Sequence, residues 1–265
     1  VVGEKDVTNL CGMLESAEPS AVAPVQQALV ASLSSQSASQ QVETITRRML
    51  QAGESKKYLY YWPLSTTGES KALSMIVDGF ENGKGDAKDA AFAALSNWKG
   101  LEVMDNLYAI AKDPASAYAE KALNSYVRLA SNPELTGENR LIYLRNAMEI
   151  AKTDAQKNTI LSQVSRTGTY LALLYAGEFI DQPALKENAA VAVMTIALAH
   201  REYSGDLVVN LMNKAAAALS NQDADYQRQS IRLLLEEMPK EKGFVSLFNG
   251  KDLTGWNGLV QNPIV

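Results

Sequence analysis

The chain has 265 residues, a formal net charge of −5 and an isoelectric point near 5.1, with 46% apolar and 21% charged residues. This composition is ordinary for a globular protein that buries a core, and the scattered lysines and arginines make nucleic acid and anionic membrane surfaces poor partners. Cys11 is the only cysteine, which excludes an intrachain disulfide and a cysteine-based metal site.

The first 55 residues predict three helices, at residues 7–14, 21–33 and 40–52, with a polar turn at 34–39. Their apolar residues follow helical periodicity, but the segment lacks the regular punctuation of the chain that follows. We therefore interpret residues 1–55 as an N-terminal helical cap or a degenerate repeat.

The densest aromatic cluster lies at residues 58–63. Tyr60, Tyr61 and Trp62 are candidate ligand-binding residues, because aromatic rings with polar edges can stack on sugars. Neighbouring positions of a helix point in different directions, so some of these rings must instead be core or interface, and this second interpretation is the favoured one.

Residues 56–239 contain an internal repeat. Five glycines in similar surroundings are spaced by 32, 37, 31 and 37 residues, an average of about 34, which is typical of a two-helix repeat. They are Gly68, Gly100, Gly137, Gly168 and Gly205. An amphipathic run follows each glycine, and a second helical pattern precedes all but the first. Glycine supplies the positive φ that a turn between helices favours, so each unit is predicted to be helix, glycine turn, helix.

These units predict an all-α fold, a HEAT-like α-α superhelix in which five to seven antiparallel helix pairs form a right-handed solenoid. Short helix pairs cannot bury an apolar face alone, so each must pack against its neighbours. The segment at residues 185–199 is apolar on every side, which predicts a helix covered by other helices all round. Its uncharged run, residues 188–200, is too short to span a bilayer.

No residue of the chain is predicted to be catalytic, to bind a cofactor or to bind a metal. His200 is the only histidine and ends an apolar helix, where a cation interacts favourably with the helix dipole. Glu236 and Glu237 fit a solvated helix face better than the facing carboxylates of a glycosidase. Residues 83–85, Gly-Lys-Gly, lack the strand and the Gly-Lys-Ser/Thr ending of a phosphate loop, and we interpret them as a turn.

The pattern changes at residues 240–265. A polar break at 240–243 precedes a short β-prone run, an Asn-Gly turn and a second short run, which together predict a linker and the start of a β domain. No basic segment followed by an apolar stretch opens the chain. We therefore expect either that a signal segment was removed or that the chain is part of a longer protein.

Two resemblances accompany these patterns. Residues 56–238, through segments 94–98, 126–130 and 182–190, resemble the HEAT-type repeat region of bacterial extracytoplasmic multidomain proteins. Residues 244–256 resemble the opening of the 3-keto-disaccharide hydrolase domain, which implies a concanavalin-like jelly roll related to glycoside hydrolases. The rest of such a domain, with any catalytic residues, would lie beyond residue 265.

The resulting functional hypothesis is a non-catalytic helical-repeat scaffold, or protein-interaction module, of a larger carbohydrate-active protein. Its partner would be another protein or the adjoining jelly-roll domain, with carbohydrate as a further candidate. The alternative is part of a glycoside hydrolase in which the solenoid shapes substrate binding. The resemblances imply a periplasmic or otherwise extracytoplasmic location.

Overall fold

A computed structural model describes residues 4–239 together with residues 251 and 252. The described residues form an all-α, solenoid-like fold of fourteen α-helices and two 3₁₀ segments, with no strand among them. The β-prone segment predicted at residues 244–256 lies outside the described residues, apart from Lys251 and Asp252.

The chain divides into two compact units, and the division falls within helix α9 (Gly137–Ile150). The first unit is Val1–Leu135 with Tyr143–Ala151, and the second is Thr136–Ile142 with Lys152–Val265. The domain boundaries expected at residues 55 and 239 stay predictions.

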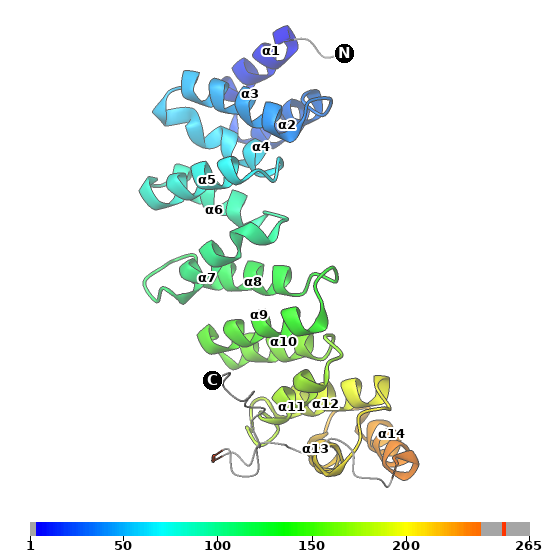
Figure 1. The fold of residues 1–265 in the computed structure, drawn as a ribbon. Helices are drawn as coiled ribbons and strands as arrows, with labels where there is room; N and C mark the ends of the chain where they lie inside the picture. Colours follow the sequence, from blue (N-terminus) through cyan, green and yellow to red (C-terminus); the bar gives the residue numbers. More distant parts are fainter. Residues whose placement is uncertain (1–3, 240–250, 253–265) are drawn as a thin grey trace, which may run out of the picture. The chain divides into compact units, whose positions relative to one another are not determined.

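The first unit is built from eight helices, the two 3₁₀ segments and the second half of α9 (Figure 1). Its elements are α1 (Glu4–Ser16), α2 (Pro19–Ser32), α3 (Ala38–Gln51), η1 (Glu54–Tyr60), α4 (Tyr61–Ser65), α5 (Ser70–Asn82), α6 (Asp86–Ser96), η2 (Leu101–Val103), α7 (Met104–Lys112) and α8 (Ala119–Ala130). The three predicted N-terminal helices are confirmed as α1, α2 and α3. Consecutive helices pack in pairs, α1 with α2, α5 with α6 and α7 with α8.

The second unit contains the start of α9 and five further helices (Figure 1). They are α10 (Asp154–Val164), α11 (Tyr170–Gly177), α12 (Lys186–Ala199), α13 (Asp206–Ala218) and α14 (Ala224–Glu237). Helix α12 contacts α10, α11, α13 and α14, which confirms that the all-apolar segment is covered on several sides. Its alanines are fully buried at positions 189, 190 and 192, so neighbouring backbones can approach closely.

Backbone N–H groups in the first turn of a helix have no partner within the helix, and at several helix starts a side chain of the preceding residue accepts a hydrogen bond from one of them. The Ser37 hydroxyl accepts from the backbone N–H of Gln40, and the Gln40 side chain accepts from Ser37 in return. Thr153 and Gln156 form the same reciprocal pair at the start of α10. Such a capping box satisfies two backbone donors that have no partner within the helix.

The repeat glycines serve two different purposes. Gly68, Gly168 and Gly205 have positive φ values of 70°, 72° and 101°, as predicted for turns between helices. The same prediction is wrong for Gly100, whose φ is −78°, and for Gly137, which begins α9 without a positive φ. At Gly137 the reason for glycine is close approach, because a Cβ there would lie 2.4 Å from the carbonyl oxygen of Thr167.

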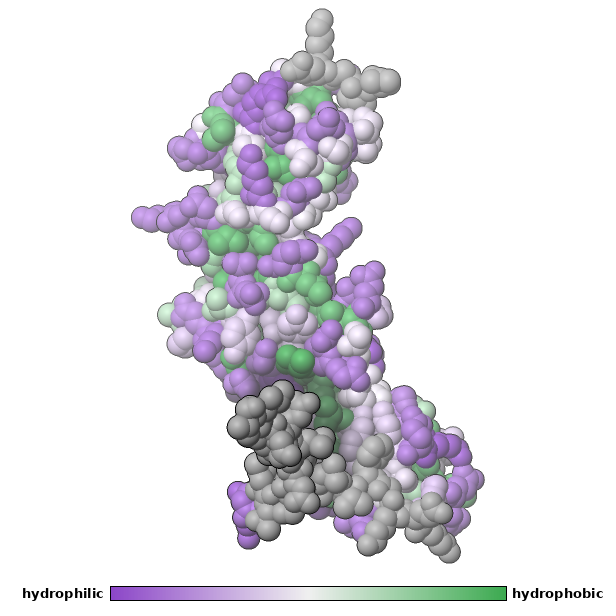
Figure 2. Space-filling model, viewed as in Figure 1, coloured by the Kyte–Doolittle hydropathy of each residue, from purple (hydrophilic) through white to green (hydrophobic). Residues whose placement is uncertain are grey.

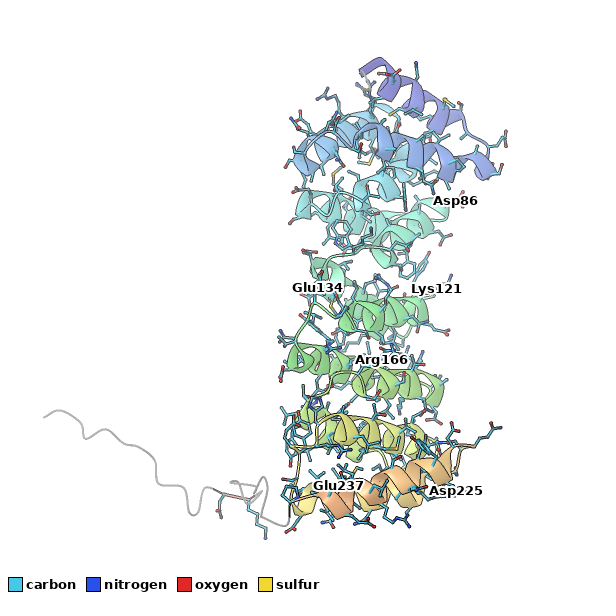
Figure 3. All side chains as sticks on the ribbon, turned by 90° about the vertical axis from the view of Figure 1, so that its right-hand side faces the viewer. Asp86, Lys121, Glu134, Arg166, Asp225 and Glu237 are labelled. Atoms are coloured by element: carbon cyan, nitrogen blue, oxygen red, sulfur yellow. The ribbon has the colours of Figure 1, made fainter. Side chains whose placement is uncertain are left out.

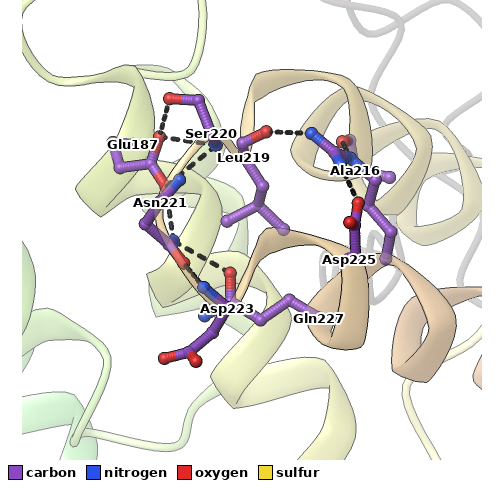
Figure 4. A network of polar contacts seen from close by, with 9 residues as sticks. Glu187, Ala216, Leu219, Ser220, Asn221, Asp223, Asp225 and Gln227 are labelled. Atoms are coloured by element: carbon purple, nitrogen blue, oxygen red, sulfur yellow. Dashed lines mark hydrogen bonds and ion pairs between the residues drawn. The ribbon is translucent and has the colours of Figure 1, made fainter.

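Polar contacts join successive layers at about one repeat of sequence separation. In the first unit, the Arg128 guanidinium donates to the carbonyl of Ser96, 32 residues away. In the second, Glu187 accepts hydrogen bonds from the backbone and side chains of Ser220 and Asn221, 33 and 34 residues away (Figure 4). These separations match the glycine interval of about 34 residues, so the repeat seen in the sequence is also the spacing of the helical layers.

Several of the charged side chains labelled in Figure 3 lie at helix ends. Asp86 begins α6, and Asp225 and Glu237 lie at the two ends of α14. Acidic residues near a helix start interact favourably with the helix dipole. Among the described residues, no helix combines the length and the apolar character that crossing a membrane requires.

Candidate functional site

The three candidate aromatic residues differ in how far they are buried. Tyr60, at the end of η1, is fully buried, and Tyr61, which begins α4, is 7% exposed. Trp62 is half-buried. The Tyr60 hydroxyl donates to the Glu15 carboxylate across 2.6 Å. Burial, together with that hydrogen bond, raises the pKa of Tyr60 far above its ordinary value, so this phenol is a neutral core residue.

Tyr61 lines a cavity of about 440 Å³ in the first unit, between α3, η1, α4 and α5. We call it the α3–α5 pocket, and its lining residues are Met49, Leu50, Lys57, Tyr61, Lys71, Ser74, Met75 and Asp78. The volume falls within the range of pockets that hold ligand groups or side chains of a partner.

One side of the α3–α5 pocket is apolar and adaptable. Met49 is buried and Met75 half-buried, while Leu50 is 61% exposed at the opening. The Thr46 hydroxyl donates to the Met75 sulfur at 3.5 Å. Unbranched thioethers adjust to different shapes, so this side can accept apolar groups of more than one kind. Figure 2 shows patches of hydrophobic surface, in green, among polar side chains in the region of the first unit.

The other lining residues include two lysines, Lys57 and Lys71, and the tyrosine Tyr61. Lys57 pairs with the exposed carboxylate of Glu54, and Asp78 accepts a hydrogen bond from Asn82 at 2.8 Å. Burial, and then the nearby Asp78, raises the pKa of Tyr61, so its hydroxyl is protonated at neutral pH.

Gly79 explains why the Tyr61 ring can lie against α5. A Cβ at position 79 would lie 2.3 Å from the Tyr61 hydroxyl oxygen, which is closer than atoms can approach. A glycine in a helix interior costs about 1 kcal/mol relative to alanine, and here it makes room for an aromatic ring. The position of the ring at the pocket therefore depends on a residue in another helix.

A second cavity of about 440 Å³ lies in the first unit between α5, α6, α7 and the turn after α7. We call it the aromatic pocket; it is lined by Phe80, Lys88, Ala109, Ile110, Asp113, Ala115, Ser116, Ala117 and Tyr118. The Lys88 ammonium lies 4.7 Å from the centre of the Phe80 ring, and the Tyr118 hydroxyl donates to Asp89 at 2.5 Å.

The sequence analysis missed the aromatic pocket. Its rings come from separate helices and a turn: Phe80 and Tyr118 have centroids 5.3 Å apart, and Phe92 packs 4.6 Å from Tyr118. They are not clustered in the sequence, so no local pattern indicates them. The rings of α5 and α6 lie about one repeat before Tyr118 in the sequence. Only this spacing could have indicated that the three rings meet.

The residues weighed as catalytic groups make local contacts at helix ends and on exposed faces. His200 ends α12, its Nδ1 lies 2.9 Å from a Glu202 carboxylate oxygen, and its ring stacks on Tyr203. Glu236 lies 3.8 Å from Arg232, and Glu237 forms an ion pair with Arg201. Across the described part of the chain, no group of three or more histidine, cysteine or acidic side chains is placed to hold a metal ion.

No protein-family model matches the chain, and no curated protein matches its sequence. The fold defines the class, an all-α helical-repeat protein. The α3–α5 pocket is the candidate site because it joins an exposed apolar side chain to cationic and hydroxyl donors.

Proposed function

We propose that this chain is a non-catalytic helical-repeat scaffold whose repeats bind a protein partner. The observation that carries the proposal is the α3–α5 pocket, where the exposed Leu50 lies beside two lysines among packed helices. An apolar anchor surrounded by polar groups is the usual composition of a protein interface.

The layered architecture supports the same proposal. Within each unit, successive layers are held together by buried side chains and by polar contacts at one-repeat spacing, such as Arg128 with Ser96. Repeat proteins of this kind present extended surfaces made of equivalent positions on successive helices. Exposed apolar side chains at Ile142, Leu171 and Leu207 give the second unit further candidate contacts.

The test is to find the partner and map its contacts. The chain is purified with its partner from the native host, the complex is rebuilt from the two purified proteins, and hydrogen exchange is measured with and without the partner. We expect protection to concentrate in helices of residues 4–239. A partner held only by residues 240–265 would contradict the proposal. So would sugar turnover by the isolated chain that a point mutation within residues 56–238 abolishes.

A second candidate rests on residues 244–256, which resemble the opening of a 3-keto-disaccharide hydrolase domain. In that case the helical repeats are part of an extracytoplasmic glycoside hydrolase and shape its substrate binding. The longer protein would be assayed on oligosaccharides with and without residues 1–240. Unchanged activity and substrate choice after the deletion would rule this candidate out.

A further inference from the structure

We propose that the aromatic pocket of the first unit binds a small organic ammonium ion whose nitrogen carries methyl groups, as in choline. The cation would lie against the Phe80 and Tyr118 rings and beside the Asp113 carboxylate. It would take the place that the Lys88 ammonium occupies over the Phe80 ring. This inference goes beyond the proposed scaffold function and does not depend on it.

The rings of the pocket form the kind of surface that attracts a cation. Phe80 and Tyr118 both line the cavity, with centroids 5.3 Å apart and planes at 74°, and the buried Phe92 packs against both. Two rings set at an angle can contact one cation together, as in the aromatic cages that bind methylated ammonium groups. The Tyr118 hydroxyl donates to the Asp89 carboxylate, which holds the ring in place and raises its electron density.

A cation of the chain itself already lies over one of these rings. The Lys88 ammonium nitrogen is 4.7 Å from the centre of the Phe80 ring, which is a cation–π distance. No ion pair of Lys88 is found in the described part of the chain. A lysine has a flexible stem and a strongly hydrated head, so it loses little when another cation displaces it into solvent.

The charges at the pocket favour a cation over an anion. Lys88 and Asp113 are the charged residues that line it, so Asp113 stays without a counter-charge in the lining once Lys88 is displaced. One Asp113 carboxylate oxygen accepts the backbone N–H of Ala115 at 2.9 Å, and no hydrogen bond to the other oxygen is found among the described residues. The net charge of −5 also favours the approach of a cation.

The lining favours an ammonium that is methylated and small. Alanine, isoleucine and aromatic side chains make up most of it, so hydrogen-bond acceptors are few. A primary ammonium or a guanidinium would leave donors unpaired there, whereas a trimethylammonium group has no donor to satisfy. The volume of about 440 Å³ fits a small ligand. The exposed large apolar side chains of the described residues all lie elsewhere, so none continues the cavity into a surface for a macromolecule.

The experiment titrates the whole chain with choline and with tetramethylammonium by isothermal titration calorimetry. We expect both ions to bind saturably. The control ligand is the neutral isostere of choline in which carbon replaces nitrogen, and it should bind at least about tenfold more weakly, because it has the shape without the charge. Ethanolamine, which lacks the methyl groups, should also bind more weakly than choline.

Three substitutions in the pocket separate the contributions. Lys88→Gln should strengthen choline binding by about threefold or more, because it removes the competing ammonium, and a gain in affinity cannot arise from unfolding. Asp113→Asn should weaken binding about tenfold, since it removes the charge but keeps an oxygen for the Ala115 N–H. Phe80→Leu should weaken it to a similar extent, because leucine is apolar but has no ring.

Matched controls lie on α7 in the same unit. The Lys112 ammonium also lies near a ring, 5.9 Å from the centre of Tyr108, but Lys112 does not line the pocket. Asp105 is an exposed acid outside the pocket. Lys112→Gln and Asp105→Asn should therefore bind choline as the unchanged chain does. Circular dichroism of all five variants shows whether each is folded.

The inference is overturned if neither ammonium ion binds, if the neutral isostere binds as tightly as choline, or if Lys88→Gln leaves the affinity for choline unchanged or lowers it. Sedimentation of the chain with phosphatidylcholine vesicles that free choline does not compete would also overturn it, because the binding would then belong to a lipid surface. None of these results changes the hydrogen-exchange footprint of a protein partner, so the scaffold function is tested separately.

Discussion

The two units fill the space between their helical layers in different ways. The first unit uses large rings: Phe80, Phe92 and Tyr118 meet between α5, α6 and the turn before α8, and Trp98 is buried after α6. The second unit also has ring contacts, such as Tyr170 with Tyr203 at 5.3 Å, and two of its glycines lie directly against side chains of other segments. A Cβ at Gly168 would lie 2.9 Å from the His200 ring, and one at Gly177 would lie 2.5 Å from Leu211.

One repeat plan accommodates both ring clusters with space beside them and glycines in close contact with neighbouring side chains. Rings from separate helices cannot interdigitate everywhere, and the aromatic and α3–α5 pockets both lie in the first unit. In both units polar groups reach across to the next layer, as Arg128 does in the first and Glu187 does in the second (Figure 4). We expect the loss of a buried ring to destabilise the first unit. In the second unit, we expect an added methyl group at Gly168 to be destabilising.

The largest expected effect is the loss of a ring in the first unit. Trp98 is 1% exposed, and its indole N–H donates to Glu102 at 3.3 Å. Trp98→Ala should lower the free energy of unfolding by about 3–5 kcal/mol, because it removes buried apolar surface and leaves a cavity. Urea unfolding followed by circular dichroism measures the change. Trp62→Ala, at a half-buried position, is the control, and an equal loss in both variants would contradict the prediction.

Two glycines with nearly the same φ value provide a direct comparison of the units. Gly68 has φ 70° and open space within 4 Å of the place that a Cβ would take, whereas Gly168 has φ 72° and the His200 ring 2.9 Å from that place. Gly68→Ala should cost about 1–2 kcal/mol from backbone strain alone. Gly168→Ala should cost about 1 kcal/mol more, because the methyl group must displace packed atoms. Equal midpoints of thermal unfolding would show that the second unit is not packed more tightly there.

Glu187 should make the second unit sensitive to acid. Burial alone would raise the pKa of Glu187, but the hydrogen bonds from Ser220 and Asn221 outweigh it and hold the pKa below its usual range. A carboxyl with a lowered pKa in the folded state stabilises the protein above the pKa of the unfolded chain. This contribution is lost as the pH falls through the folded-state pKa. Glu187→Gln should therefore lower the unfolding free energy by about 1 kcal/mol at neutral pH, given the partial exposure of the site.

The pH dependence of that difference is the decisive measurement. In urea unfolding, the gap between Glu187→Gln and the unchanged chain should close as the pH falls below about 4, where glutamates become protonated. Glu149→Gln, at an exposed position on α9, should show little gap at either pH. A gap for Glu187→Gln that stays constant down to acid pH would mean that the charge of Glu187 contributes nothing.

The smallest effect concerns an exposed ion pair of the second unit. Lys214 lies 2.6 Å from Asp181, but the two side chains are 52% and 74% exposed. Lys214→Met should change the unfolding free energy by less than about 1 kcal/mol, because solvent screens exposed charges. High salt should remove even that difference. A larger, salt-independent loss would indicate that this pair holds the layers together more strongly than its exposure implies.

Much of the fold could be predicted from local patterns. The glycine interval, the amphipathic runs and the all-apolar segment at residues 185–199 correctly predicted paired helices and a covered helix. The glycine argument failed at Gly100 and Gly137, neither of which has a positive φ. At Gly137 the reason is that a sequence does not distinguish a glycine needed for positive φ from one needed for close approach.

The candidate site was predictable only in part. Tyr61 was among the candidate residues and does line a pocket, but Leu50, Lys71 and Met75 were not singled out. They lie on α3 and α5, separated in sequence by α4 and η1, and each is ordinary within its own helix. A local pattern can indicate which side of a helix is apolar, but not which neighbouring helix leaves part of that side uncovered.

The sequence by itself determined the helices, their turns and the length of the repeat, because these depend on periodicity and backbone preferences within a few residues. Only the tertiary structure decided that Tyr60 is core while Tyr61 reaches a pocket, and that Glu187 meets Ser220 across a layer. Such outcomes depend on which side chains from distant segments fill the same volume, and that is a property of the packed molecule.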